Sequence, residues 1–500
     1  MGFRSVVFLL IFLLYFVSGE RKVQLGQSLL PTTPPTSWSS SSGLFAFGFY
    51  QQDNGFKVGI WLIPSKKVVW TAKRDDPPVT GNSTIELTRE GKLVLRSEQG
   101  GEQLIANPSG SAASMLSSGN FVLYNETSEI IWQTFDHPTD TILGGQTLST
   151  DMSLISSLLD TDHSTGRYRL TMQGDGNLVS YALNTEGTPA DAYWASGIVR
   201  PNPCSLYLNS TGSLAIINNS NSYTLEILYN YSTSVFNTSK TLIYRATLDS
   251  DGIFNFYCHT FTRSDESSIS VDWSRPKNPC EVKGFCGLNR FCTFDDDKPS
   301  CRCLPGTNLI DSNRISLGCG RNSSREGCRG GVENTTYFNI GTMEKMSWGD
   351  VPYYVDKPMS LEDCKKSCLE DCNCEAAQYV DSSCKKYSLP LKYVRRDLSA
   401  SSSPTALFKV GTRSIKSDNG TVPMPWKSQP VVVKSKTALT KLVGGEEVDK
   451  NTLENMVKVA LWCIQDEPHL RPSMKSVVLM LEGITDTDVS IPPCPTAASM

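Results

Sequence analysis

The distribution of cysteine constrains this chain more than any other feature. Sixteen of its 500 residues are cysteine, and fourteen of them fall between residues 204 and 384. An even set clustered in this way indicates a disulfide framework formed in an oxidising compartment. Zinc binding is the weaker alternative, because the close pairs have C-x-C spacing rather than the C-x-x-C spacing of most zinc sites. The predicted disulfide cysteines, whose pairing the sequence leaves open, are Cys204, Cys258, Cys280, Cys286, Cys292, Cys301, Cys303, Cys319, Cys328, Cys364, Cys368, Cys372, Cys374 and Cys384.

The N-terminus supports export. Arg4 precedes an apolar run from Val6 to Val17, and small residues suit cleavage after Gly19, as in a signal peptide. Twelve apolar residues fall short of the roughly 20 that span a bilayer, and no later stretch resembles a membrane span. We therefore predict a secreted, glycosylated protein. The Asn-x-Ser/Thr sequons stand at Asn82, Asn125, Asn209, Asn218, Asn230, Asn237, Asn322, Asn334 and Asn419.

Charge and histidine content argue against several function classes. The formal net charge is −4 and no long basic run occurs, which disfavours nucleic acid as a partner. Only four histidines are present, which leaves little for histidine-based catalysis. The acidic run Asp295–Asp297 lacks the spacing of a calcium loop and is predicted to be solvated surface. No metal and no other cofactor is predicted.

Residues 20–275 have the pattern of an all-β structure. Short alternating apolar runs, such as those at 44–50 and 58–62, are separated by Gly, Asn, Asp and Pro. A Gly-x-apolar pattern recurs along this region and indicates repeated sheet units around shared cores. Coincidence among many strands remains the alternative for the last two copies. The glycines that open the copies are Gly91, Gly119, Gly176, Gly212 and Gly252.

The remaining segments differ in amino-acid composition. Residues 280–319 hold six cysteines and few aliphatic side chains, too little core to fold without disulfides. Within the second cysteine cluster, Ser360–Leu369 is predicted to be a helix with Ser360 as its N-cap and two cysteines at i and i+4 on one face. Residues 411 to about 447 have the polar composition of a linker. The tail regains helical spacing of apolar residues.

These motifs together resemble the plant G-type (bulb-type, S-domain) lectin receptor-like kinases, in particular the grass lectin receptor kinases. Residues 38–50 are similar to the opening of the bulb-type lectin domain. Residues 69–75 resemble its VWTANRD signature, with Lys73 in place of the usual Asn, and residues 132–143 resemble its W-x-S-F-D-x-P-T-D-T signature. The two cysteine clusters resemble the EGF-like and PAN/apple modules of these receptors.

The resemblance implies a multidomain, mainly β fold. It consists of tandem bulb-lectin, β-prism-like domains, then disulfide-rich EGF-like and PAN/apple-like modules, and a short α-helical remnant of a kinase C-lobe. The expected divisions are a signal peptide at 1–19, lectin domains at 20–148 and 149–275, an EGF-like module at 276–320, a PAN/apple-like domain at 328–412, a linker at 413–447 and the kinase remnant at 448–500.

The kinase remnant is the point where the chain departs from the family. Residues 459–483 resemble the last helices of the family's kinase C-lobe. The glycine-rich loop, the V-A-I-K lysine and the H-R-D, D-F-G and A-P-E motifs that phosphoryl transfer requires do not occur in the sequence. We expect a truncated receptor that lacks the membrane span and catalysis. The alternatives are a receptor kinase by descent and a non-functional truncated gene product.

The resemblance also implies a sugar site. Bulb-type lectins bind mannose through Q-x-D-x-N-x-V-x-Y, which is complete here once, as Gln173, Asp175, Asn177, Val179 and Tyr181. Alternate residues of a strand share one face, so all five are expected to line one groove. The competing interpretation is an edge strand whose polar residues face water. Other copies are degenerate: one retains Asn120, Val122 and Tyr124, with Leu116 and Ser118 where Gln and Asp would stand.

The predicted function is therefore recognition rather than catalysis. We expect a secreted or cell-surface lectin-like ectodomain that binds mannose-type carbohydrate or protein ligands in plant signalling or defence. Its expected partners are glycans or glycoproteins, and also intact receptor kinases that the EGF-like and PAN modules would contact.

Overall fold

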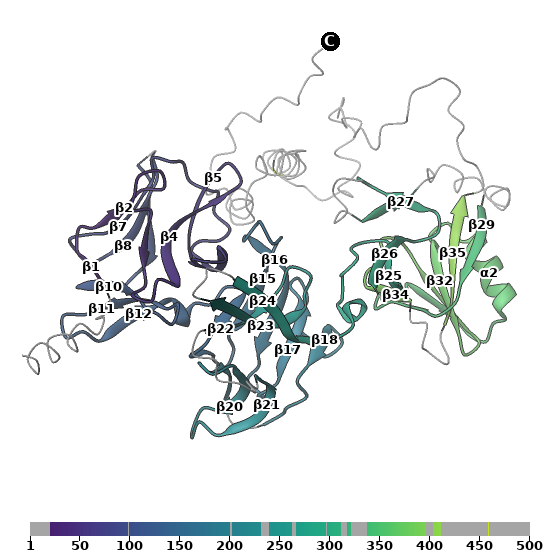
Figure 1. Cartoon of the computed structure of the whole chain (residues 1–500). Coiled ribbons are helices and arrows are strands. Elements are labelled where there is room, and N and C mark those ends of the chain that lie inside the picture. The colour runs from purple at the N-terminus through teal and green to yellow at the C-terminus, as the bar shows by residue number, and fades with distance from the viewer. Residues whose placement is uncertain are drawn as a thin grey trace, which may run out of the picture. The chain divides into compact units, whose positions relative to one another are not determined.

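The computed structural model describes residues 21–98, 100–200, 203–231, 240–262, 267–296, 298–311, 318–321, 338–396 and 404–411, together with Val459. The chain divides into two compact units, Met1–Lys416 and Ser417–Met500, and every element named below belongs to the first (Figure 1). Several predictions lie outside the described residues: the signal peptide, the linker, the kinase remnant apart from Val459, Cys328, and the sequons at Asn237, Asn322, Asn334 and Asn419.

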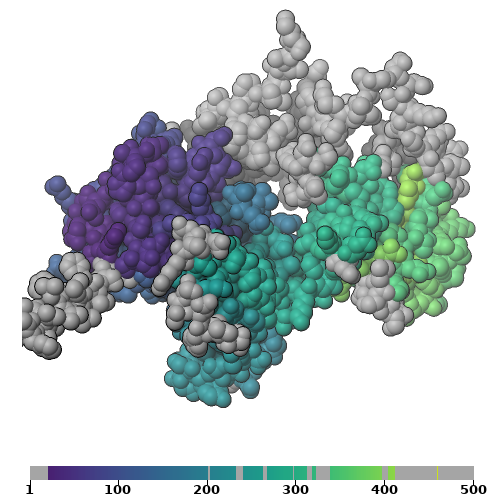
Figure 2. Space-filling view, in the orientation of Figure 1, coloured from purple at the N-terminus to yellow at the C-terminus, as the bar shows by residue number. Residues whose placement is uncertain are grey.

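Three four-stranded antiparallel sheets form the first domain, which we call the first prism (residues 21–136; purple to blue in Figures 1 and 2). The first sheet contains β1 (Lys22–Gln24), β10 (Ala112–Met115), β11 (Phe121–Tyr124) and β12 (Ile130–Gln133). The second contains β2 (Ser28–Leu29), β7 (Thr84–Leu87), β8 (Leu93–Arg96) and β9 (Glu102–Ala106). The third contains β3 (Ser37–Ser39), β4 (Phe45–Gln52), β5 (Gly55–Leu62) and β6 (Lys67–Thr71). The short helix η1 (Thr134–Asp136) ends the domain.

All three sheets turn their alternate apolar residues into one core. At its centre the rings of Phe47 and Phe121 stack with their centroids 3.9 Å apart. Trp38 stacks against both of them, and Trp70 adds a fourth ring beside Phe47. Aromatic residues of this size supply most of the apolar area that such small sheets can bury. The segments that resemble the lectin signatures therefore form the core of this domain.

A second prism repeats the arrangement with three more four-stranded antiparallel sheets around their own core. The first sheet contains β13 (Thr141–Leu143), β22 (Lys240–Leu248), β23 (Phe254–Thr262) and β24 (Ser267–Arg275). The second contains β14 (Gln146–Leu148), β19 (Cys204–Leu208), β20 (Ser213–Asn218) and β21 (Thr224–Asn230). The third contains β15 (Ser153–Ser157), β16 (Thr165–Met172), β17 (Leu178–Ala182) and β18 (Ala192–Ala195).

The boundary between the two prisms differs from the expected division at residue 148. Strands β13 and β14 precede that position, yet they pair with β22 and β19 of the second prism. The apolar side chains of Ile142 and Leu148 belong to the second core, whereas Leu143 packs in the first. The second domain therefore begins at about residue 141, because strand pairing rather than the end of a signature motif decides where a strand belongs.

The recurring glycines have one structural role in both prisms. Gly91, Gly119, Gly176, Gly212 and Gly252 all have φ between 80° and 90°, and they precede β8, β11, β17, β20 and β23, the third strand of five different sheets. A side chain at Gly119 would also meet Leu143, because its Cβ would lie 2.4 Å from a methyl group. Positive φ is inexpensive only for glycine. The repeat predicted from the sequence is therefore confirmed in all five copies.

The cysteine-rich segment after β24 is held by three disulfides, Cys280–Cys292, Cys286–Cys301 and Cys303–Cys319. Its elements are η2 (Pro279–Glu281), β25 (Arg290–Asp295), β26 (Lys298–Cys303), β27 (Thr307–Leu309) and β28 (Cys319–Arg321). Strand β25 also pairs in parallel with β34 (Val394–Arg396), which pairs with β30 (Met346–Ser347). This module and the next are therefore joined through one sheet.

A five-stranded sheet and one helix form the last described module. The sheet contains β29 (Phe338–Met343), β35 (Thr405–Gly411), β32 (Ala376–Val380), β33 (Ser383–Tyr387) and β31 (Tyr354–Asp356). Helix α2 (Leu361–Glu370) begins as predicted, with Ser360 Oγ accepting from the backbone N–H of Asp363 at 3.1 Å. The disulfide Cys364–Cys384 fixes its buried face to β33, and Cys368–Cys374 fixes it to the loop that precedes β32. Cys372 is disulfide-bonded as well.

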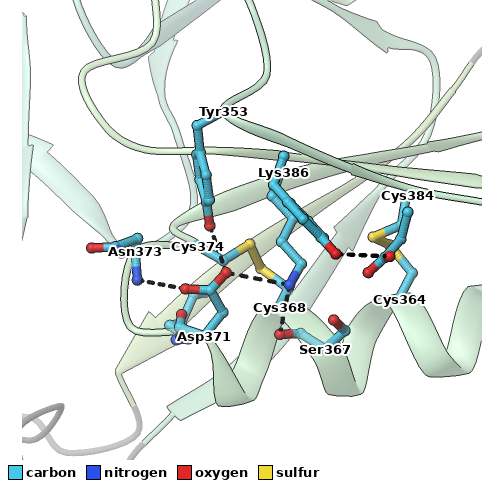
Figure 3. Close-up of polar contacts among 12 residues, drawn as sticks. Tyr353, Cys364, Ser367, Cys368, Asp371, Asn373, Cys374, Cys384 and Lys386 are labelled. Carbon is cyan, nitrogen blue, oxygen red and sulfur yellow. Dashed lines mark hydrogen bonds and ion pairs between the residues drawn. A yellow bond between two sulfur atoms is a disulfide. The ribbon is translucent and has the colours of Figure 1, made fainter.

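The C-terminus of α2 carries a carboxylate, which the negative end of the helix dipole disfavours. Three hydrogen-bond donors offset this unfavourable interaction of the Asp371 carboxylate, as Figure 3 shows. Tyr353 Oη donates to it at 2.9 Å, Lys386 Nζ at 3.2 Å and the backbone N–H of Asn373 at 2.9 Å. Partial burial acts to raise the pKa of Asp371, but these donors outweigh it and the pKa is lowered. The carboxylate thus holds the helix end against β33.

Two of the predicted disulfide cysteines are thiols instead. Cys204 in β19 and Cys258 in β23 are buried in the core of the second prism, on strands of different sheets. Burial raises the pKa of both thiols. Cysteine in such a place packs as a small apolar residue. The prediction was wrong for these two because the prism supplies a hydrophobic core, so the segment does not depend on cross-links as the smaller modules do.

Lys73, which stands where the lectin signature usually has Asn, has φ of 44°. A lysine in the left-handed region is strained, whereas Asn tolerates that region well. We predict that Lys73→Asn raises the free energy of unfolding by about 0.5–1 kcal/mol. Chemical denaturation of the secreted protein measures the change. Lys73→Ala is the matched control: it removes the lysine but keeps the strained Cβ, and an equal gain there would refute the backbone explanation.

Candidate functional site

The five motif residues lie at the hairpin between β16 and β17. Gln173 follows β16, and a tight turn closes where the N–H of Gly176 donates to the carbonyl of Gln173 at 3.0 Å. Strand β17 begins at Leu178, so Asp175 lies in the turn and only Val179 and Tyr181 lie within the strand. The expectation that all five residues continue one strand is therefore replaced by a turn followed by a strand.

One face of the hairpin brings together the two ends of the motif. Gln173 Nε2 donates to Tyr181 Oη at 2.9 Å. Antiparallel pairing sets Tyr181 opposite Arg169 and Val179 opposite Thr171, so these side chains share a face. Tyr181 and Val179 are nearly fully buried, with 3% and 1% of their surface exposed. Only the polar edge of this part of the motif reaches solvent.

The turn residues Asp175 and Asn177 offer the most accessible polar atoms of the motif. One carboxylate oxygen of Asp175, Oδ1, accepts from the backbone N–H of Asn177 at 3.0 Å, while the residue remains exposed. Asn177 Oδ1 accepts from Ser196 Oγ at 2.9 Å and from the N–H of Gly197 at 3.0 Å. These bonds fix both side chains before any ligand arrives. The second oxygen of Asp175 and the amide N–H₂ of Asn177 remain available to hydroxyl groups.

Arg169 is a residue of this face that the motif does not contain. Its guanidinium lies 5.0 Å from the ring centroid of Tyr181 and donates to the carbonyl of Thr185 at 3.1 Å. A cation over an aromatic ring holds that ring in place. Sequence spacing alone could not assign this neighbour, because the pairing of residues 169 and 181 depends on the register of the hairpin.

The degenerate copy in the first prism has a structural role instead. Asn120 is 5% exposed, and its side chain donates to Gln133 at 2.8 Å and accepts from Thr134 Oγ1 and from the N–H of Phe135, each at 3.2 Å. These three hydrogen bonds go to η1 and to the end of β12. Asn120 therefore fastens these elements together in a nearly buried position.

The sequons within the described residues lie at turns and strand ends. Asn82 and Asn230 are exposed, and Asn125, Asn209 and Asn218 are partly exposed. Such positions can accept an attached glycan without disturbing a core. Within the same described ranges, no helix is both long enough and apolar enough to cross a bilayer.

Comparison with known families finds three matches along the chain. Residues 67–158 match the family described as D-mannose binding lectin, residues 210–309 match the S-locus glycoprotein domain, and residues 334–389 match the PAN-like domain. Together with the two prisms and the disulfide-rich modules, these matches define a chain built from lectin-like, S-locus glycoprotein and PAN-like domains.

The homologues of the chain are G-type lectin S-receptor-like serine/threonine-protein kinases. It is 29% identical to LECRK4 of Oryza sativa subsp. indica, over 91% of this chain and 59% of that protein. It is 32% identical to LECRK3 of the same plant, over 80% of this chain and 52% of that protein. The chain therefore spans a little over half the length of these relatives. A monomeric mannose-binding lectin from Gastrodia elata aligns with 28% of this chain and 98% of its own, at 23% identity and a TM-score of 0.19.

Proposed function

We propose that this chain binds mannose-type glycans through the turn and strand from Gln173 to Tyr181 of its second prism. The observation that carries the proposal is the set of polar groups that the fold has already fixed there. Asp175 and Asn177 are held by backbone and Ser196 contacts, and Tyr181 is held by Gln173 and Arg169. Prearranged groups lose little conformational freedom when a ligand binds. The lectin receptor kinase homologues support a sugar as that ligand, and the D-mannose binding lectin match supports a sugar for the neighbouring residues 67–158.

We propose further that the chain acts in recognition outside the cell and does not transfer phosphoryl groups. Its sequence contains none of the motifs that hold ATP and magnesium in protein kinases. The disulfides of the two smaller modules and the sequons at exposed turns support an oxidising compartment. Intact receptor kinases are the proposed protein partners of the EGF-like and PAN-like modules, as the chain's homologues suggest.

Replacing Asp175 by alanine tests the glycan site. The variant keeps the backbone hydrogen bond from Gly176 to Gln173 but loses the Asp175 carboxylate, which accepts from the N–H of Asn177 and offers the exposed charged acceptor. A charge-assisted hydrogen bond to a ligand contributes about 1.5–3 kcal/mol. We expect binding to mannose-type glycans to weaken at least tenfold, measured on a glycan array with the secreted protein and then by titration.

The matched control is Glu186→Ala, which removes an exposed carboxylate from the adjoining loop between β17 and β18 and has no assigned role in the motif. Its binding is expected to equal that of the unmodified protein. Absence of mannose-type binding, or equal binding by the protein and its Asp175→Ala variant, would refute the proposed site.

A further inference from the structure

The loop between β15 and β16, residues 158–164, connects the second prism to the first, and we call it the docking loop. Gln52, in β4 of the first prism, donates from Nε2 to Asp162 Oδ1 at 2.9 Å. Its Oε1 accepts from the backbone N–H of His163 at 3.2 Å. Because Gln52 is only 5% exposed, these two hydrogen bonds are shielded from water. The end of the docking loop is thus held directly against β4.

Two charged residues of the first prism extend this contact along the chain. Arg74 donates to the carbonyl oxygens of His163 at 2.9 Å and of Ser164 at 3.1 Å. The two carboxylate oxygens of Asp75 accept from Thr165, the first residue of β16, one from its N–H and the other from its hydroxyl, at 2.7 Å each. Four consecutive residues of the second prism therefore each have a hydrogen bond to the first. All of these bonds are lost if the docking loop leaves the first prism.

The imidazole of His163 lies inside this joint between the prisms. It meets Tyr50 of the first prism edge to face, with ring centroids 5.6 Å apart. Its Nδ1 lies 3.3 Å from Ser157 Oγ, in β15. Ser157 has a single hydroxyl hydrogen, which it donates to Asp140 Oδ2 at 2.6 Å. In the neutral ring, this network assigns the hydrogen to Nδ1, and Nε2 is the nitrogen that would take up a second proton.

Charged groups face this ring from both prisms. Arg74 and Lys67, in the first prism, oppose a positive charge on His163. Asp140 and Asp162, which precede and follow β15 in the chain, favour one. Burial is the largest of these influences, and it also disfavours the charged ring. Together they lower the pKa of His163 below its ordinary value of about 6.5 while the loop is docked.

Two ionisable neighbours of the ring keep their charge states near neutral pH. Burial raises the pKa of Tyr50, so its hydroxyl stays protonated. Burial acts to raise the pKa of Asp162 as well, but hydrogen bonds from Ser164 outweigh it and the pKa is lowered. Of these three groups, His163 is therefore the one that responds to mild acid.

We propose that the joint between the two prisms is an acid-sensitive latch, which opens when a proton binds to His163 and the docking loop leaves the first prism. A protonated ring in the docked loop would be buried beside the positive charges of Arg74 and Lys67. Each prism stays folded when the latch opens, since each has a core of its own. No residue of the Gln173–Tyr181 motif takes part, so the latch does not depend on the proposed glycan site.

The direction of the pH dependence follows from the two states of His163. Once the docking loop is free, the imidazole reaches water and regains its ordinary pKa of about 6.5. Because the pKa is lower in the docked loop, protons bind preferentially to the open form. The advantage of the docked form is complete above about pH 6.5 and is lost as the pH falls toward the lowered pKa.

Hydrogen–deuterium exchange of the full secreted chain tests the latch, because the backbone N–H groups of His163 and Thr165 donate across the joint. The measured quantity is the protection factor of a peptide that spans residues 158–165, at pH 7.5 and at pH 5.0, corrected for the intrinsic exchange rate at each pH. In the unmodified protein we expect protection to fall at least threefold at pH 5.0. Circular dichroism at both pH values checks that the prisms remain folded.

His163→Gln is the matched control, because glutamine retains a donor for Ser157 but does not titrate. Its protection is expected to change less than twofold between the two pH values. Equal protection of the unmodified protein at both pH values, or an equal fall in His163→Gln, overturns the latch.

Lys67→Gln decides the matter if His163→Gln does not fold. It removes one of the positive charges near the ring from a partly exposed position, which is expected to raise the pKa of His163 in the docked loop. The fall in protection at pH 5.0 is therefore expected to be smaller than in the unmodified protein. A fall of the same size in both overturns the latch.

Discussion

Replacing Arg74 by alanine is expected to lower the free energy of unfolding of the two prisms by about 4 kcal/mol and to separate their unfolding into two transitions. The guanidinium of Arg74, in the first prism, donates to four carbonyl oxygens of the second: those of Ile155 at 2.8 Å, His163 at 2.9 Å, and Ser156 and Ser164 at 3.1 Å each. It also lies 3.3 Å from Ser157 Oγ. Removal leaves these acceptors without their donor.

The effect is large because the guanidinium is largely withdrawn from water. Burial lowers the pKa of Arg74, although nearby carboxylates oppose that shift. A guanidinium presents five N–H donors in a rigid fork, whereas a lysine ammonium has three donors on a single nitrogen and reaches fewer of these carbonyl oxygens. Arg74→Lys is therefore expected to lose about half as much stability as Arg74→Ala.

Differential scanning calorimetry of the secreted protein measures both effects. The matched control is Arg89→Ala, an exposed arginine of the first prism, for which we expect a change within about 0.5 kcal/mol. One transition in Arg74→Ala, with stability equal to that of the control, would show that the bridge does not couple the prisms.

The second large effect is a dependence of stability on pH that His259 creates. His259 is fully buried, and its Nε2 accepts from Arg245 Nε at 2.9 Å. Burial, followed by the charges of Arg245 and Lys67, lowers the pKa of His259 to about 3. The unfolded chain has a histidine pKa of about 6.5. The stability that this difference supplies is complete above pH 6.5 and is lost as the pH falls toward 3.

Between pH 7 and pH 4, His259 is expected to remove about 3 kcal/mol of stability from the second prism. The measurement is a pair of urea denaturation curves at the two pH values, for the protein and for His259→Gln. The glutamine variant retains an acceptor for Arg245 but does not titrate. The predicted quantity is the change in stability between the two pH values for the protein, minus the same change for His259→Gln. The contributions of all other titrating groups cancel in this difference.

Asp251 provides a control, because its effect on the pH dependence of stability has the opposite sign to that of His259. Burial raises its pKa to about 6, so protonation below that value relieves a cost in the folded state. Relative to Asp251→Asn, the protein is expected to gain stability over the same interval. Equal pH dependences for the protein and His259→Gln would contradict the assignment of a neutral, buried His259.

Much of the fold could be predicted from the sequence because its signals are local. The glycine repeat marks positive φ at the start of a strand, which the neighbouring residues hardly influence. Ser360 caps α2 through an atom three residues away, again a local interaction. The family signatures at 38–50, 69–75 and 132–143 were recognisable because they contain the large core rings.

The candidate sites were less predictable because they depend on contacts between distant residues. The motif from Gln173 to Tyr181 was readable as a string, but its turn, and the place of Arg169 over Tyr181, follow from the register of a hairpin. A hollow of the first prism is lined by Trp70, Ile105 and Trp132, which come from three different sheets. No spacing in the sequence predicts that these side chains lie together.

By itself, the sequence determined the mainly β architecture, the glycine repeat and the helix that the second cysteine cluster carries, since each depends on short-range periodicity, turn chemistry or composition. Only the tertiary structure decided that Cys204 and Cys258 are core thiols, that β13 and β14 belong to the second prism, and that Arg74 joins the two prisms. The physical reason is common to all three. Strand pairing and burial bring together residues that are tens of positions apart, and those long-range contacts determine what each side chain meets.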